Sequence, residues 1–206
     1  MSLAAVERTA IKRLGRLEYL PAWRAMREFT LGRSEATRDE IWVLEHPPVY
    51  TFGQGADRAH GPAPGPIPVV NSDRGGEVTY HGPGQAVVYA LVDLARRGIK
   101  VKPYVALLEE AVLDLLGGRG ARKAGAPGVY VDGAKVAALG IRVARGRAYH
   151  GVALNVDMDL RPFDAIAPCG YPGLRVTQLR ELGFRESAEV MGERLAKRIA
   201  ARLEHA

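Results

Sequence analysis

The chain has 206 residues, 47% of them hydrophobic and 25% charged, which is ordinary for a soluble globular protein. Its single cysteine excludes an intrachain disulfide and a CxxC metal or redox site. No apolar run approaches the roughly 20 residues needed to cross a bilayer, and the N-terminal stretch lacks the long apolar region of a secretory signal. We therefore expect a cytoplasmic protein in which residues 1–206 form a single domain.

The net charge is +6, from 29 basic and 23 acidic residues. A basic surface fits either nucleic acid or an acidic protein partner. The arginines are dispersed along the chain, without a basic tail or a stripe interleaved with aromatic residues. We therefore expect neither a nucleic-acid nor a membrane partner, whereas an acidic protein partner remains compatible with the charge.

The first half of the chain predicts one helix followed by several strands. Apolar residues at helical spacing indicate an amphipathic helix over 18–33. The segment EIWVLEH (40–46) is typical of a buried strand that ends at Pro47–Pro48, and we expect a long loop over 49–68. Residues 69–94 then contain a short strand, a turn and two further strands, the last over 86–92.

The second half predicts two helices and a pair of hairpins. Pro103 suits the first turn of a helix that Gly117–Gly118 ends. Asp132–Gly133, between alternating residues, is typical of a type I′ hairpin turn, and Arg145–Gly146 marks a second turn. A C-terminal helix begins at about Ser187. Hairpin-connected strands with helices between them indicate an α+β fold, or mixed α/β, rather than a doubly wound parallel sheet.

Familiar catalytic motifs are absent, and their absence narrows the search to Cys169. The sequence has no GxxxxGK[ST] loop, no complete dinucleotide-binding glycine pattern, no HExxH zinc motif and no GxSxG. Cys169 lies in IAPCGYPGL, where prolines and glycines turn the backbone and could direct the thiol into a cleft. It is therefore the best candidate for a nucleophile.

A thiol needs a nearby base or cation to become the reactive thiolate, and three residues could supply it. His81 and His150 are either structural, hydrogen-bonded histidines or partners of Cys169. Lys135 shares an alternating face with Val129 in an apolar segment. It is either an exposed lysine at a sheet edge or one held inside against an anionic partner.

The segment RGGEVTYHGPGQ (74–85) is the other candidate for a functional site, because glycines and polar residues are concentrated in it. Its two glycine pairs allow backbone to approach a ligand closely, while Arg74 and His81 supply polar contacts beside it. The alternative is that the segment forms two ordinary turns on either side of a strand.

Four segments in order resemble one family. RGGEVTYHGPGQAVVYALVDL resembles the signature of the lipoyl(octanoyl) transferases of lipoate synthesis, and KVAALGIRV, YHGVALNV and IAPCGYPGLRVTQL resemble that family's later segments. The resemblance covers roughly residues 40–180. It implies a fold similar to the catalytic domains of lipoate– and biotin–protein ligases, a mixed sheet packed with helices.

The resemblance also implies roles for individual residues. Cys169 would be the acyl-thioester nucleophile, and Lys135 would lower its pKa and shuttle protons. The substrate-binding residues would be Arg74, Gly75, Gly76, Glu77, Val78, Thr79, Tyr80, His81, Ala138, Leu139, Gly140, Gly151, Val152 and Ala153. No metal and no cofactor would be needed.

The implied reaction transfers an octanoyl group from octanoyl-acyl carrier protein to a lipoyl-domain lysine through a Cys169 thioester, without ATP. The acceptors would be lipoyl domains of 2-oxo acid dehydrogenase complexes and the glycine cleavage H protein, and the enzyme would be a monomer. Two other functions stay open, an ATP-dependent lipoate or biotin ligase and a non-enzymatic acyl- or protein-binding module. A Cys169–His81 pair is an alternative mechanism.

Overall fold

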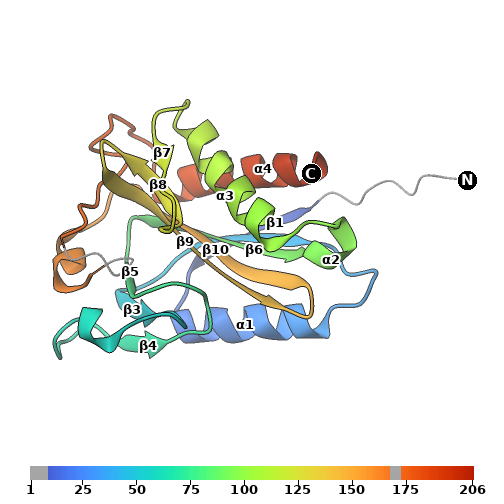
Figure 1. Cartoon of the computed structure of the whole chain (residues 1–206), viewed down its shortest axis with the longest axis horizontal. Coiled ribbons are helices and arrows are strands. Elements are labelled where there is room, and N and C mark those ends of the chain that lie inside the picture. Colours follow the sequence, from blue (N-terminus) through green and yellow to red (C-terminus); the bar gives the residue numbers. More distant parts are fainter. Residues whose placement is uncertain (1–8, 168–172) are drawn as a thin grey trace, which may run out of the picture.

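A seven-stranded mixed sheet forms the centre of the computed structural model, which describes residues 9–167 and 173–206 (Figure 1). Its strand order is β1-β2-β6-β10-β9-β8-β7, with β1 parallel to β2 and the other neighbours antiparallel. The bounds are β1 Ala10–Arg16, β2 Glu40–Glu45, β6 Gln85–Asp93, β7 Ala121–Arg122, β8 Gly128–Val131, β9 Ala134–Ala144 and β10 Arg147–Asn155. This mixed architecture confirms the expected α+β class.

A second, three-stranded sheet lies beside α1, on the same side of the large sheet (Figure 1). It has the order β4-β3-β5, with bounds β3 Val49–Phe52, β4 Val69–Asn71 and β5 Thr79–His81. The 3₁₀ turns η1 (Arg58–His60) and η2 (Arg161–Ala165) lie in the connections. The expectation of a loop from residue 49 is wrong at its start, because 49–52 form β3.

Helices cover both faces of the large sheet (Figure 1). They are α1 Tyr19–Gly32, α2 Leu94–Arg97, α3 Val101–Leu115 and α4 Ala188–Glu204. Alternate residues of the central strands divide between the faces: Val43 and Val88 pack in the cluster with α3 and α4, whereas Trp42 and Tyr89 pack in the cluster with α1. Every residue of β6 is therefore buried.

The hairpin turns form as the sequence predicts. Asp132 and Gly133 join β8 to β9 with φ of +49° and +78°, and Arg145 and Gly146 join β9 to β10 with φ of +51° and +76°. Two successive positive φ values define the type I′ turn, whose twist matches that of the flanking strands. The expected C-terminal helix is also confirmed, because Ser187 caps α4 by accepting from the Val190 N–H.

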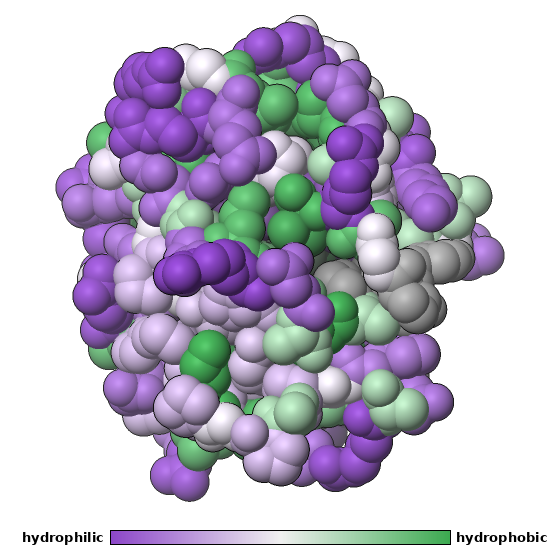
Figure 2. Space-filling view, turned by 90° about the vertical axis from the view of Figure 1, so that its left-hand side faces the viewer, coloured by the Kyte–Doolittle hydropathy of each residue, from purple (hydrophilic) through white to green (hydrophobic). Residues whose placement is uncertain are grey.

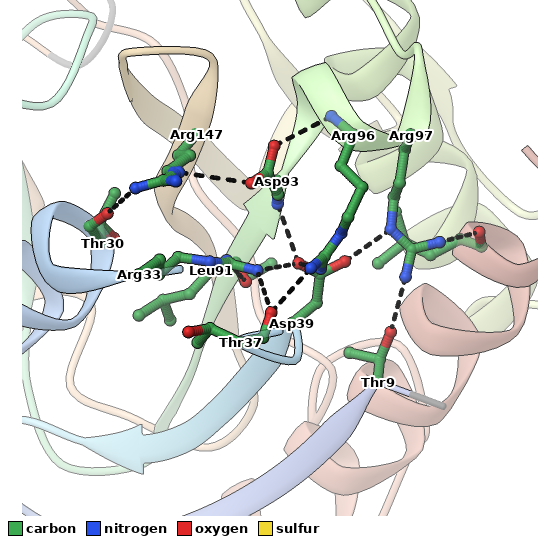
Figure 3. A network of polar contacts seen from close by, with 12 residues as sticks. Thr9, Thr30, Arg33, Thr37, Asp39, Leu91, Asp93, Arg96, Arg97 and Arg147 are labelled. Atoms are coloured by element: carbon green, nitrogen blue, oxygen red, sulfur yellow. Dashed lines mark hydrogen bonds and ion pairs between the residues drawn. The ribbon is translucent and has the colours of Figure 1, made fainter. Parts of the chain in front are cut away.

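A buried ion-pair network joins the edge of the sheet to the helices (Figure 3). The Asp39 carboxylate accepts from Arg33, from Arg96 Nη2 at 2.9 Å and from Arg97 Nε at 2.6 Å. The Asp93 N–H also donates to it, and Arg97 continues to the Leu203 carbonyl on α4. Burial alone would raise the pKa of Asp39, but these hydrogen bonds lower it. The network therefore depends on an ionised carboxylate.

We expect Asp39→Asn to lower the free energy of unfolding by about 3–5 kcal/mol, because it leaves the fully buried Arg33 guanidinium without its counter-charge. Urea unfolding measures the change. Asp114→Asn is the control: that carboxylate is half exposed beside Arg202, so its loss should cost at most about 1 kcal/mol. Equal, small effects for the two variants would contradict this account of the network.

Candidate active site

A cavity of about 260 Å³ lies where small residues meet on adjacent strands. Gly140 of β9 faces Gly151 of β10, and Ala138 faces Ala153. All four line the cavity, together with Val87 and Tyr89 of β6. Neighbouring positions without large side chains leave a hollow that the surrounding core does not fill. On the face toward which the β8–β9 hairpin projects, Figure 2 shows hydrophobic residues gathered in a hollow between more hydrophilic ones.

The segment that follows β4 forms one wall of the cavity. The Gly75 N–H donates to the Ile141 carbonyl at 2.9 Å, and the Arg74 carbonyl accepts from the Gln54 N–H at 2.9 Å. Glycine is required on the neighbouring strand end, because a Cβ on Gly53 would lie 2.1 Å from the Gly76 carbonyl oxygen. Glycine at position 53 thus allows backbone to approach backbone, and Gly75 and Gly76 also line the cavity.

Arg74 is buried against β3. Its Nε and Nη2 donate to Thr51 Oγ1 at 3.1 and 2.9 Å, and Nη2 also donates to the Thr51 carbonyl at 2.6 Å. Nη1 donates to the Gly75 carbonyl at 3.0 Å. The guanidinium therefore fixes the conformation of the wall at the edge of the cavity.

The structure brings most of the residues expected at a substrate site into this one cavity. The lining includes Lys135 and, of the expected substrate-binding residues, Arg74, Gly75, Gly76, Glu77, Val78, Thr79, His81, Ala138, Leu139, Gly140, Gly151, Val152 and Ala153. Tyr80 does not line the cavity. Its ring packs against Tyr50 and Phe163, because alternate residues of β5 point to opposite sides.

Lys135 is buried, with 4% of its surface exposed, so the interpretation of an exposed edge lysine is wrong. Its Nζ donates to the Pro127 carbonyl at 2.9 Å and lies 5.3 Å from the centre of the Tyr130 ring. The two-residue turn at Asp132–Gly133 pairs Val131 with Ala134 and therefore Tyr130 with Lys135. Lys135 thus shares a face with Tyr130 and not with Val129, because the alternation expected from the sequence was counted straight through the turn.

Cys169 lies outside the described residues, but backbone hydrogen bonds hold the described chain on either side of residues 168–172. The Ala167 N–H donates to the His60 carbonyl at 2.9 Å. Further along, the Lys135 N–H donates to the Arg175 carbonyl at 2.8 Å, and the Thr177 N–H donates to the Lys135 carbonyl at 3.0 Å. Residues 175–177 thus run parallel to β9 at Lys135.

A buried chain of side-chain amides links three segments of the site. His81 Nδ1 bonds Gln85 Oε1 at 2.7 Å, Gln85 Nε2 donates to Asn155 Oδ1 at 3.0 Å, and Asn155 Nδ2 donates to the Thr177 carbonyl at 3.0 Å. The sequence analysis did not select Gln85 or Asn155. The available signal was the position of two amides at the ends of otherwise apolar strands, where a buried polar group needs partners.

His150 is a second residue that sequence reasoning left undecided, and it also lines the cavity. Its φ is +64° within β10, and its Nε2 bonds Asp73 Oδ1 at 2.9 Å, while Nδ1 has no hydrogen-bond partner within the described chain. Burial would raise the pKa of Asp73, but hydrogen bonds from His150, Tyr149 and Trp23 lower it to about 2. Burial lowers the pKa of His150, which keeps the ring neutral at pH 7.

The His81 ring stacks on Tyr19 beside the cavity, and the His46 ring meets both of these rings edge-on. His46 is enclosed between the Leu17 carbonyl on Nδ1 at 2.6 Å and the Tyr89 hydroxyl on Nε2 at 2.7 Å. Burial lowers the pKa of His46 to about 4 and that of His81 well below its usual range. Both rings are therefore neutral at pH 7, so neither contributes a positive charge to the site.

The described residues contain no group of three or more histidine, cysteine, aspartate or glutamate side chains arranged to hold a metal ion. No helix in the described ranges has both the length and the apolar composition needed to cross a membrane.

The fold is shared with solved lipoate-protein and biotin protein ligases. A lipoate-protein ligase A solved with ATP superposes with a TM-score of 0.78 at 13% identity, over 96% of this chain and 86% of that one. The biotin protein ligase from Aquifex aeolicus superposes with a TM-score of 0.58 at 13% identity, over 95% of this chain and 70% of that one. At such identities the likeness concerns the fold alone.

Sequence comparison defines the family. The family model described as the lipoyl protein ligase A/B catalytic domain matches residues 18–200. The octanoyltransferase of Thiobacillus denitrificans is 60% identical over 182 residues, which cover 87% of this chain and 84% of that relative. The octanoyltransferase of Dechloromonas aromatica is 52% identical over 197 residues, covering 94% and 96%. The chain belongs to the lipoyl protein ligase A/B catalytic domain family and, within it, to the octanoyltransferases, which are acyltransferase enzymes.

The low pKa of His46 predicts a specific loss of stability in acid. As pH falls from the ordinary value of about 6.5 to about 4, the unfolded chain binds a proton at this residue and the folded chain does not, so unfolding is favoured. Between pH 7 and pH 5 we expect the native protein to lose about 2 kcal/mol more stability than His46→Gln, measured by urea unfolding. An unchanged pH dependence in His46→Gln would contradict the assignment.

Proposed function

We propose that this enzyme transfers an octanoyl group from octanoyl-acyl carrier protein to a specific lysine of a lipoyl domain, through a thioester on Cys169 and without ATP. The observation that carries the proposal is the placement of Lys135. Its buried amine lines the apolar cavity, and its backbone binds residues 175–177, a few positions beyond Cys169 in the sequence. We further propose that residues 1–206 act as a single catalytic domain.

The cavity suits a medium-length acyl chain. Its floor is formed by glycines, alanines and aliphatic side chains, so methylene groups can replace water there at about 0.8 kcal/mol each. Lys135 also lines this space, and we infer that the thioester carbonyl binds beside its amine. The carboxylate of Glu77 is turned outward, to the Asp57 N–H and His60.

In the first half of the reaction, the Cys169 thiolate attacks the carbonyl carbon of the octanoyl thioester. A carbon–sulfur bond to Cys169 forms, and the tetrahedral intermediate collapses by breaking the bond to the phosphopantetheine sulfur. Lys135 Nζ, as the ammonium, protonates the departing thiolate and becomes a neutral amine. The positive charge of Lys135 also favours the thiolate form of Cys169 beforehand.

In the second half, the ε-amine of the acceptor lysine attacks the octanoyl-Cys169 carbonyl. The neutral Lys135 amine takes the proton that the attacking nitrogen loses, and the Cys169 thiolate leaves. One thioester becomes one amide and both enzyme groups return to their starting states, so the exchange needs no ATP. The net charge of +6 favours encounter with acidic carrier proteins and lipoyl domains, since complementary charge raises the association rate.

We expect that the purified protein, mixed with octanoyl-acyl carrier protein without ATP or acceptor, gains one octanoyl group on Cys169. Intact-protein and peptide mass spectrometry detect the adduct and its position. The adduct should disappear when an apo lipoyl domain is added. Cys169→Ser should give no thioester adduct, and Lys135→Met should slow its formation by about 10²–10⁴-fold, the usual contribution of a general acid–base group.

The other functions predict different outcomes. Modification of the acceptor only with free octanoate and ATP, and without dependence on Cys169, would show a ligase. Binding of the octanoyl carrier protein without an adduct or turnover would show a binding module. Loss of acylation in His81→Ala with full activity in Lys135→Met would assign the base to His81 instead.

A further inference from the structure

A carboxylate lies on the buried face of α3, where the helix packs on the sheet. Glu109 is only 7% exposed and is flanked by Leu108 and Val112, which are fully buried. Carboxylates seldom occupy such positions unless a specific partner requires them. The adjacent Glu110 behaves ordinarily, since it lies near the surface and pairs with Arg122 at 3.1 Å.

Glu109 binds the turn that precedes β8. Its Oε1 accepts from the Gly128 N–H at 2.9 Å. The carbonyl of the same peptide group, Pro127 C=O, accepts from Lys135 Nζ at 2.9 Å. Since the N–H and C=O of a planar trans peptide point in opposite directions, one peptide group lies between the Glu109 carboxylate and the Lys135 ammonium.

The contact on the lysine side is tight and needs glycine. A Cβ on Gly128 would lie 2.4 Å from Lys135 Cε and 2.6 Å from the Ala137 carbonyl oxygen, and the Gly128 φ is +142°. The backbone at Gly128 therefore lies directly against the lysine side chain. Any rotation of the Pro127–Gly128 peptide would move both the hydrogen-bond acceptor of Lys135 and the surface on which its side chain packs.

We propose that Glu109 is a positioning residue for Lys135, acting through the Pro127–Gly128 peptide group. By accepting from the Gly128 N–H, it fixes the orientation of that peptide and so directs the Pro127 carbonyl toward Nζ. The ammonium is then held in the cavity in one position, which general acid–base catalysis requires. The catalytic part of this inference rests on the proposed function, whereas the effect on the position of Lys135 does not.

The test uses Glu109→Leu, which removes the acceptor, Glu109→Gln, which retains it, and Glu110→Gln as the control on the same helix. The first measurement is the rate of acetylation of Lys135 by acetic anhydride, followed by peptide mass spectrometry, with the half-exposed Lys12 as the internal reference. We expect Glu109→Leu to raise the Lys135 rate several-fold relative to Lys12. Glu109→Gln and Glu110→Gln should leave it unchanged.

The second measurement is the rate of Cys169 acylation from octanoyl-acyl carrier protein in the same variants and in combination with Lys135→Met. Glu109→Leu should lower the acylation rate about tenfold with an unchanged KM for the donor, and Glu109→Gln should restore it. In the Lys135→Met background, Glu109→Leu should have no further effect, because both changes remove the same contribution.

Three outcomes would overturn the inference: unchanged labelling of Lys135 in Glu109→Leu, no rescue by Glu109→Gln, or an equal rate loss in both backgrounds, which would show a merely structural residue. If Lys135→Met acylates at the native rate, the catalytic role proposed for Lys135 fails instead. The labelling experiment then still decides whether Glu109 positions the lysine.

Discussion

The pairing of Lys135 with residues 175–177 is the interaction on which the rest of the site depends. Two backbone hydrogen bonds, of 2.8 and 3.0 Å, lay this segment parallel to the start of β9. They join parts of the chain that are some forty positions apart and that share no local structural signal. The Thr177 carbonyl then accepts a hydrogen bond from the Asn155 amide. The Asn155 side chain in turn bonds Gln85, and Gln85 bonds His81. One connected set of hydrogen bonds therefore links β5, β6, β10, residues 175–177 and the start of β9 beside the cavity.

The cavity itself results from the lack of large side chains at neighbouring positions of the sheet. Every residue of β6 is buried. Across β9 and β10, the facing pairs Gly140–Gly151 and Ala138–Ala153 carry no large side chains, so the space beside them stays hollow. Where β2 begins and β6 ends, the Asp39 network joins β6 to α2 and α4 (Figure 3). A rigid frame and a local absence of side chains together produce a defined pocket.

Features encoded by a few neighbouring residues could be predicted from the sequence. The Asp132–Gly133 and Arg145–Gly146 turns depend on local φ preferences, and α1, α3 and α4 follow apolar periodicity. Strands β1 and β3 could not be predicted from the sequence. β1 is a short edge strand with mostly exposed side chains, and β3 lies next to a glycine-rich loop. Strand formation there depends on partners distant in sequence.

The same distinction holds at the site. Motif order indicated which segments would meet, and the structure gathers most of those residues around one cavity. The burial of Lys135 could not be derived, because it depends on residues 175–177, which pair with Lys135 from some forty positions away. The roles of Gln85, Asn155 and Glu109 could not be derived either, because their hydrogen-bond partners lie 19 to 70 positions away in the sequence. Tertiary contacts, rather than local pattern, decide which polar residues are buried.

The central claim is that Lys135 activates the cysteine, and its most direct test uses the fact that Cys169 is the single cysteine of the chain. We would measure the rate of Cys169 alkylation by iodoacetamide as a function of pH, in the native protein and in Lys135→Met. The account predicts that the native thiol titrates below the ordinary thiol pKa of about 8.5 and that Lys135→Met raises this pKa. Superimposable titration curves for the two proteins would contradict it.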